Sequence, residues 1–104
     1  MYDYVARYTA GATEYFVPAR VSADVAEACV GEAERAVEAL GLRDLTRVDI
    51  LVDRAGTPWV LEVNVSPGLT ETSLVPMAAQ AAGMSLADLC RRIIEAATAR
   101  WDRV

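Results

Sequence analysis

Histidine and lysine are both absent from this 104-residue sequence, in which all ten basic residues are arginine. Without histidine the chain cannot form an imidazole-based triad or proton shuttle, and it lacks the commonest zinc ligand. Without lysine, Schiff-base catalysis and the phosphate-binding lysine of a P-loop are excluded within this chain. These two absences narrow the function more than any residue type that is present.

The sequence has two cysteines, fewer basic than acidic residues, and no long apolar run. Cys29 and Cys90 lie in predicted helices outside any metal-ligand spacing, so both are predicted to be reduced, buried packing residues. The formal net charge of −5 argues against nucleic-acid binding. No signal-like leader follows Met1, and no apolar run could span a membrane. We therefore expect a cytoplasmic protein that binds neither nucleic acid nor membranes.

The pattern of helices and β segments predicts an α+β fold. The length indicates a single small domain over residues 1–104, or a piece of a larger one, that needs further chain to cover its core. Ser22 and Gly41 bound the clearest helix, and Ser85 with Asp88 forms a capping-box-like start to the last one. Strand-forming residues gather near the amino terminus and around a central turn. The expected helices are residues 23–40, 73–82 and 86–100, and the expected β segments are residues 2–8, 13–17, 46–53 and 58–64.

The central β segments predict a hairpin whose pairing brings two acids together. A turn at Ala55-Gly56 sets Asp49 opposite Glu62 and Arg47 opposite Asn64, and extends to Leu51 opposite Val60 and Asp53 opposite Pro58. Because strand side chains alternate, one face carries the four polar residues. The other face is predicted to be apolar, with Val48, Ile50 and Val52 against Val63, Leu61 and Trp59.

Two opposed carboxylates repel unless a positive charge lies between them. Arg47 could supply that charge, which would make this face an ordinary surface network of Arg47, Asp49 and Glu62. A divalent cation is the other alternative, because two carboxylates and the Asn64 amide oxygen form a hard ligand set that suits Mg²⁺. The hairpin alone leaves both alternatives open.

The residues around the hairpin resemble the carboxyl-terminal signature of D-alanine–D-alanine ligases, which are ATP-grasp enzymes. The similarity covers nearly the whole chain. It rests on residues 47–50 (RVDI), 61–70 (LEVNVSPGLT), 71–78 (ETSLVPMA) and 2–8 (YDYVARY). The resemblance implies an ATP-grasp carboxyl-terminal subdomain, an antiparallel sheet packed with helices, in which the fold is incomplete because the amino-terminal and central lid domains are absent.

The resemblance also implies a role for each matching residue. Asp49, Glu62 and Asn64 would bind two Mg²⁺ ions, with Mn²⁺ as an alternative, and these ions would bridge the ATP phosphates. Arg47 and the Gly68 N–H would stabilise the oxyanion of the tetrahedral intermediate, while Ser73 and the Leu74 N–H would hold the carboxylate of the second D-alanine. Tyr8 would belong to the loop that closes over the substrates, and Arg7 would approach the transferred phosphate.

The implied activity is ATP-dependent joining of two D-alanines through an acyl phosphate for peptidoglycan precursors and cell-wall biogenesis. The chain departs from the family at Arg7, where lysine is usual, and at Met1, where an aromatic residue usually packs on adenine. One alternative is a non-catalytic remnant or Mg-nucleotide-binding module that is inactive without the missing domains. Another is a related ATP-grasp ligase that uses D-lactate, D-serine or an amino-acid pair. Assembly with a separate amino-terminal half, or as a homodimer, is left open.

Overall fold

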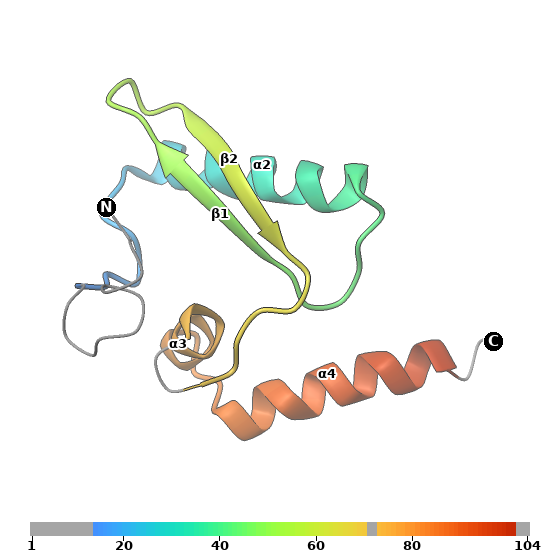
Figure 1. The fold of residues 1–104 in the computed structure, drawn as a ribbon. Helices are drawn as coiled ribbons and strands as arrows, with labels where there is room; N and C mark the ends of the chain where they lie inside the picture. The colour runs from blue at the N-terminus through green and yellow to red at the C-terminus, as the bar shows by residue number, and fades with distance from the viewer. Residues whose placement is uncertain (1–13, 71–72, 102–104) are drawn as a thin grey trace.

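The computed structural model describes residues 14–70 and 73–101, which form a two-stranded antiparallel sheet and three helices (Figure 1). The elements in chain order are α2 (Ala23–Ala39), β1 (Arg47–Val52), β2 (Pro58–Asn64), α3 (Leu74–Ala81) and α4 (Leu86–Trp101). Helices packed with an antiparallel ribbon confirm the predicted α+β class. The predicted strand at residues 2–8 lies outside the described residues.

Helix α2 begins and ends where its capping residues predict. The Val25 N–H donates to the Ser22 hydroxyl at 3.3 Å, which satisfies one of the donors at the helix start. At the other end Gly41 has φ 64°, and the Leu42 N–H donates to the Val37 carbonyl at 3.0 Å. This 6→1 bond defines a Schellman motif, whose left-handed residue is easiest for glycine. The helix therefore stops at the loop that leads into β1.

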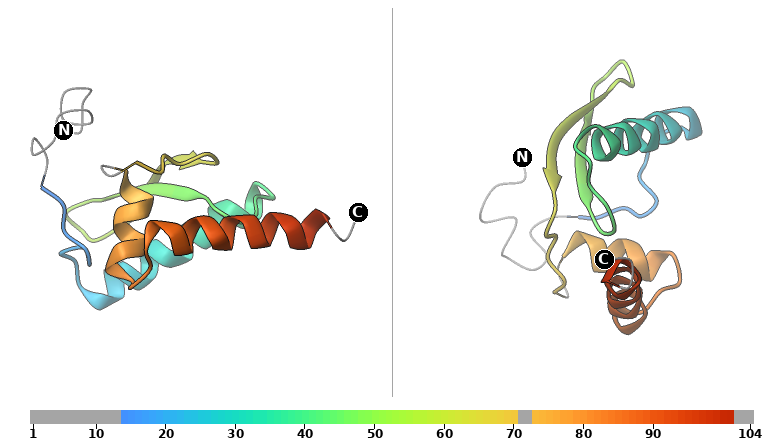
Figure 2. Two further views of the ribbon diagram at one scale, coloured as in Figure 1. Left: turned by 90° about the horizontal axis from the view of Figure 1, so that it is seen from below. Right: turned by 90° about the vertical axis from the view of Figure 1, so that its right-hand side faces the viewer.

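One face of the ribbon is covered by α2, which packs on both strands and more extensively on β2. Two views show that the opposite face is not covered by any helix of the described residues (Figures 1 and 2). The turn also approaches α2, because a Cβ added at Gly56 would lie 3.2 Å from Val25 Cγ2. The strands thus place most of their apolar side chains against α2 and their polar side chains on the open face.

The predicted register is right in one half of the ribbon and wrong in the other. Arg47 pairs with Asn64 and Asp49 with Glu62, as predicted, but Leu51 pairs with Trp59 and Val52 with Pro58. A β-bulge after Asp49 leaves Leu61 as the extra residue between the two halves. Val60 rather than Leu61 therefore pairs with Ile50 on the apolar face, while Trp59 shares the polar face and Leu61 is 65% exposed.

The turn explains the one-residue shift. Asp53 Oδ1 accepts hydrogen bonds from the N–H groups of Ala55 and Thr57, both at 2.9 Å, and Gly56 takes the φ of 82° that this tight loop requires. The Trp59 indole N–H donates to Asp53 Oδ2 at 2.9 Å. That bond, followed by those from the backbone, lowers the pKa of Asp53 despite some desolvation. Asp53 is thus part of the turn rather than a strand residue opposite Pro58.

The segment 13–17 was predicted as a strand, and the structure contradicts this where it describes the chain. Residues 14–22 contain bends and no strand. Tyr15, Phe16 and Val17 all have exposed side chains. Strand-forming residues become a strand when a neighbouring strand accepts their backbone hydrogen bonds, and the ribbon provides no pairing for this segment.

Helices α3 and α4 pack together beyond one end of the ribbon (Figure 2). Gly83 has φ 83° and follows α3, as predicted. The capping box is confirmed in both directions: the Asp88 N–H donates to Ser85 Oγ and the Ser85 N–H donates to Asp88 Oδ2, each at 3.1 Å. At the far end of α4, Arg100 Nη2 lies 2.7 Å from Asp44 Oδ2, which ties this helix to the loop before β1.

Little of the described chain is buried. Leu89, at 7% exposure, is the one large apolar side chain in the described residues that counts as buried. Cys29 and Cys90 are free and half-buried, less enclosed than predicted. The Cα radius of gyration is 15.1 Å, whereas a compact domain of this length has a value of about 13 Å. In the described residues, no helix is long and apolar enough to cross a membrane.

Candidate functional site

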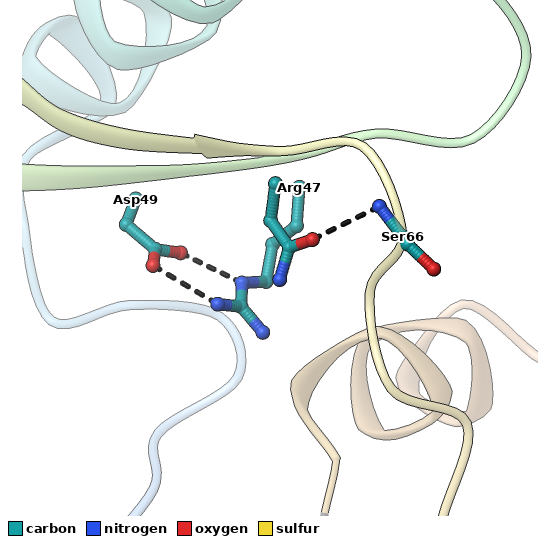
Figure 3. A network of polar contacts seen from close by, with 4 residues as sticks. Arg47, Asp49 and Ser66 are labelled. Carbon is teal, nitrogen blue, oxygen red and sulfur yellow. Dashed lines mark hydrogen bonds and ion pairs between the residues drawn. The ribbon is translucent and has the colours of Figure 1, made fainter.

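The open face of the ribbon gathers the four polar residues that the sequence singled out. Asp49 stands directly opposite Glu62, and Arg47 directly opposite Asn64. Arg47 and Asp49 project from β1 on the side away from α2 (Figure 3). Paired residues of neighbouring strands share a face, so Glu62 and Asn64 lie on this side as well. We call these four residues the acidic ribbon face.

Arg47 and Asp49 form a two-pronged ion pair. Arg47 Nε lies 2.8 Å from Asp49 Oδ1, and Arg47 Nη2 lies 3.1 Å from Asp49 Oδ2 (Figure 3). The side chains are 24% and 29% exposed, so the pair is partly shielded from water. A planar guanidinium that grips both oxygens holds a carboxylate in a defined orientation. One positive charge therefore sits beside the opposed acids, as one of the two alternatives predicted.

Asn64 directs the chain out of β2. Its Oδ1 accepts a hydrogen bond from the Ser66 N–H at 2.9 Å (Figure 3), an Asx-type turn that redirects the backbone after the last strand residue. Pro67 follows and is buried. The Asn64 side chain is thus oriented by the loop that carries Gly68, so the acidic ribbon face and this loop form one continuous region.

The donor set of the acidic ribbon face fits a hard divalent cation. Its oxygens come from two carboxylates and one amide, the ligand type that Mg²⁺ prefers, with remaining positions left to phosphates and water. Within residues 14–70 and 73–101, no group of three or more acidic, histidine or cysteine side chains is placed to hold a metal ion.

Gly68 and Ser73 lie in contact across the loop. A Cβ added at Gly68 would lie 2.8 Å from Ser73 Oγ, closer than real Cβ atoms approach, so an alanine there would displace the Ser73 hydroxyl. Ser73 is the residue before α3, but its side chain makes no capping hydrogen bond to the helix. Ser73 therefore occupies the N-cap position without the side-chain hydrogen bond that such a residue usually makes. Leu74 is the first residue of α3, so its N–H points out of the helix start.

Thr70 belongs to this region and was not identified from the sequence. The Thr70 N–H donates to Ser73 Oγ at 3.0 Å, and the two hydroxyl oxygens are 2.7 Å apart. The signal in the sequence was a threonine three residues before a predicted helix start, a spacing at which hydroxyls contact nearby backbone. Of the other predicted residues, Arg7 and Tyr8 lie outside the described residues.

An open hollow of about 700 Å³ lies elsewhere, where α3 meets α4. It is lined by Gly83, Met84, Asp88, Arg91, Arg92, Glu95 and Ala96. None of the predicted site residues borders it. Its opposite charges include an ion pair between Arg91 and Asp88 at 2.9 Å, so they compensate one another. The candidate site is therefore the acidic ribbon face with the loop to Ser73.

Comparison with solved structures defines the class of protein. The crystal structure of D-alanine–D-alanine ligase from Bacillus anthracis complexed with ATP superposes with a TM-score of 0.70 and 36% sequence identity, over 74% of this chain and 27% of that chain. The chain therefore has the fold of a carboxyl-terminal ATP-grasp subdomain. The D-ala D-ala ligase C-terminus family matches residues 1–95, and the chain belongs to that family.

Curated relatives agree with this assignment. The D-alanine–D-alanine ligase of Methylacidiphilum infernorum is 49% identical over 100 residues, which is 96% of this chain and 33% of that protein. The ligase of Bordetella pertussis is 52% identical over 99 residues, which is 95% of this chain and 31% of that protein. The chain thus spans about a third of the length of the relatives that it matches.

Proposed function

We propose that this chain is the carboxyl-terminal part of an ATP-dependent D-alanine–D-alanine ligase that serves peptidoglycan precursor synthesis in the cytoplasm. The observation that carries the proposal is the pairing of Asp49 with Glu62 and of Arg47 with Asn64 on one face of the ribbon. That arrangement occurs in a chain of the ligase family, next to the loop that holds Gly68 and Ser73.

Phosphoryl transfer is the first step assigned to this region. The first D-alanine attacks the γ-phosphate of ATP through its carboxylate, which yields an acyl phosphate and ADP. Such a transfer needs charge neutralisation and alignment more than covalent help from the protein. Asp49, Glu62 and Asn64 would hold two Mg²⁺ ions, which supply that neutralisation on the phosphates. Arg7 is assigned to the transferred phosphate through the family resemblance.

Acyl transfer is the second step. The amine of the second D-alanine attacks the acyl carbon, and a carbon–nitrogen bond and a tetrahedral oxyanion form. The carbon–oxygen bond to phosphate then breaks, inorganic phosphate leaves, and the attacking nitrogen releases one proton to complete the amide. Arg47 carries a permanent positive charge, and the Gly68 N–H is a backbone donor, so both suit this oxyanion. Ser73 and the Leu74 N–H would bind the carboxylate of the attacking D-alanine. A helix start with an uncapped end supports that role. Tyr8 would help to close the site.

The rest of the ligase is the partner that this chain needs. Large apolar side chains are exposed on α2, on both strands and on α4, and the matched relatives are three times as long. The missing chain would supply the pocket for the first D-alanine and the second half of the nucleotide clamp. We therefore assign no activity to the 104 residues alone. Homodimerisation, if present, would use that missing chain.

The proposal is tested with a chimera. The amino-terminal two thirds of the Methylacidiphilum infernorum ligase, joined to this chain, should release phosphate from ATP in the presence of D-alanine, whereas the chain alone should not. D-Lactate and D-serine in place of the second D-alanine test the neighbouring substrate classes. A well-folded chimera that binds Mg-ATP without turnover would instead support a non-catalytic remnant, and turnover by the chain alone would contradict the proposed need for a partner.

A further inference from the structure

The contact between Thr70 and Ser73 is closer and more complete than a loop turn requires. The Ser73 N–H donates to the Thr70 carbonyl at 3.0 Å, while the Thr70 N–H donates to Ser73 Oγ at 3.0 Å. The two hydroxyl oxygens are 2.7 Å apart, which is an ordinary length for a hydrogen bond between hydroxyls. Three hydrogen bonds thus join two residues that are exposed or half-buried and open to a ligand.

Either hydroxyl can be the donor in this contact, and one of the two directions leaves the Ser73 proton available to a ligand. A hydroxyl has one proton to donate and two lone pairs that accept. The Thr70 N–H already occupies one lone pair of Ser73 Oγ. If the Thr70 hydroxyl donates into the second lone pair, the Ser73 proton has no acceptor within this pair and points outward. Hydrogen bonds in such a chain polarise one another, so the outward O–H becomes a stronger donor.

Two further observations show how the Ser73 hydroxyl is oriented. Serine before a helix normally turns its hydroxyl toward the N–H groups of the first turn, and Ser73 does not. Gly68 approaches Ser73 Oγ so closely that a Cβ there would lie 2.8 Å away. The Ser73 hydroxyl is therefore held by Thr70, in space that the absence of a side chain at Gly68 leaves open, and it makes no capping bond to the helix.

We propose that Thr70 is a positioning residue, which donates its hydroxyl proton to Ser73 Oγ and thereby aims the Ser73 proton at the carboxylate of the second D-alanine. The inference rests on the proposed function, in which Ser73 binds that carboxylate. Thr70 itself does not touch the substrate. Its hydroxyl keeps Ser73 from rotating into the capping position, so it sets the affinity for the acceptor amino acid rather than the rate of phosphoryl transfer.

The kinetic test uses the active chimera with four variants: Thr70→Val, Thr70→Ser, Ser73→Ala and the control Thr98→Val. Thr98 loses the same hydroxyl, but its Oγ1 bonds to the Ile94 carbonyl on α4, at 2.8 Å and away from the site. Ser73→Ala should raise the KM of the second D-alanine about tenfold or more, and Thr70→Val about three- to tenfold. Thr70→Ser and Thr98→Val should stay close to the unaltered chimera, and the KM of ATP should not change.

A second measurement uses the 104-residue chain itself. Amide hydrogen exchange at position 70 reports the bond from that N–H to Ser73 Oγ. Exchange should be slow in the unaltered chain and in Thr70→Ser, and about tenfold faster in Ser73→Ala and Thr70→Val, because in each of these variants the acceptor is lost or rotates away. This readout does not depend on catalysis.

The outcomes separate the positioning role from the proposed function. If Ser73→Ala leaves the KM of the second D-alanine unchanged, the assigned role of Ser73 fails. If Ser73→Ala raises it but Thr70→Val does not, the function stands and the positioning role of Thr70 is wrong. An equal rise in the KM of the second D-alanine in Thr70→Val and Thr70→Ser would also overturn the positioning role. So would a parallel change in the KM of ATP, because either result would indicate general disruption of the loop.

Discussion

At the scale of single residues, the acidic ribbon face contains one carboxylate that is held by an ion pair and one that is exposed. Asp49 is gripped by Arg47 through both oxygens, whereas Glu62 across the ribbon is exposed. The ion pair with arginine fixes the orientation of the partly shielded carboxylate, whereas the exposed carboxylate is available to a ligand. The two acids therefore differ in what their removal should do, and Glu62 offers the cleaner test of metal binding.

Replacing Glu62 by glutamine should remove phosphoryl transfer while the fold is kept. The change preserves the size of the side chain and removes one of the two negative charges that would hold Mg²⁺. We expect the rate of phosphate release in the chimera to fall about a hundredfold or more, with an unchanged melting temperature. Steady-state kinetics over a range of Mg²⁺ concentrations measures the effect.

The matched control is Glu34→Gln, which removes the same charge from an exposed position of α2. It should leave both the rate and the Mg²⁺ dependence unchanged. A near-normal rate in Glu62→Gln would mean that Glu62 is not a metal ligand, and the acidic ribbon face would then be a surface ion network. A loss of the fold in Glu62→Gln would point to a structural role instead.

At the scale of the elements, the helix bounds and the strand pairing that could be predicted depend on interactions between residues close in sequence. The bounds of α2 depend on Ser22 and Gly41, and the start of α4 on Ser85 and Asp88, all of which act within a few residues. The pairing of Asp49 with Glu62 was also predicted correctly. Local capping and alternation are strong enough to be read from sequence because they do not depend on distant contacts.

The strand register near the turn and the direction of the Ser73 hydroxyl could not be predicted from the sequence, because each depends on tertiary geometry. The Asp53 turn and the bulge at Leu61 shift the pairing by one residue and then restore it, so the polar end of the ribbon was right and the turn end was wrong. Alternation alone cannot reveal a bulge, because the inserted residue leaves the pattern on both sides intact. The direction of the Ser73 hydroxyl likewise depends on Thr70 and Gly68, which approach it through the loop.

Two glycine-to-alanine changes in or beside α2 should have opposite effects on stability. Gly41 has φ 64°, where a Cβ is strained, so Gly41→Ala should lower the free energy of unfolding by about 1–2 kcal/mol. Gly31 lies within the helix, and a Cβ there would meet the Arg35 guanidinium at an ordinary 3.7 Å. Gly31→Ala should therefore raise the free energy of unfolding by about 0.5–1 kcal/mol.

Urea unfolding of the chain, followed by circular dichroism, measures both changes against the same reference. Each variant adds one methyl group, so differences in apolar surface cannot explain opposite signs. If both variants stabilised the chain, the left-handed end of α2 would not exist in solution. If both destabilised it, the helix would not be continuous through position 31.

At the scale of the whole molecule, exposed apolar surface is the dominant feature. Trp101 is 82% exposed, Leu61 65% and Ile94 64%. The ribbon has two strands in the described part of the chain, so each presents an edge whose backbone groups are not satisfied by another described strand. Soluble monomers rarely expose this much apolar surface. Further protein is the natural cover for such surfaces.

The amino-terminal two thirds of a related ligase, added as a separate polypeptide, should therefore stabilise this chain. A partner that binds the folded chain raises its stability by an amount that grows with the logarithm of concentration, about 2.7 kcal/mol at a hundred times the Kd. The melting temperature should rise with each addition of partner. Leu61→Ser should weaken the rise while changing the stability of the chain alone by less than about 0.5 kcal/mol, because Leu61 is exposed there. Glu34→Gln should behave like the unaltered chain. A melting temperature that stays constant at every partner concentration would contradict the idea that the exposed apolar surface is an interface with the rest of the ligase.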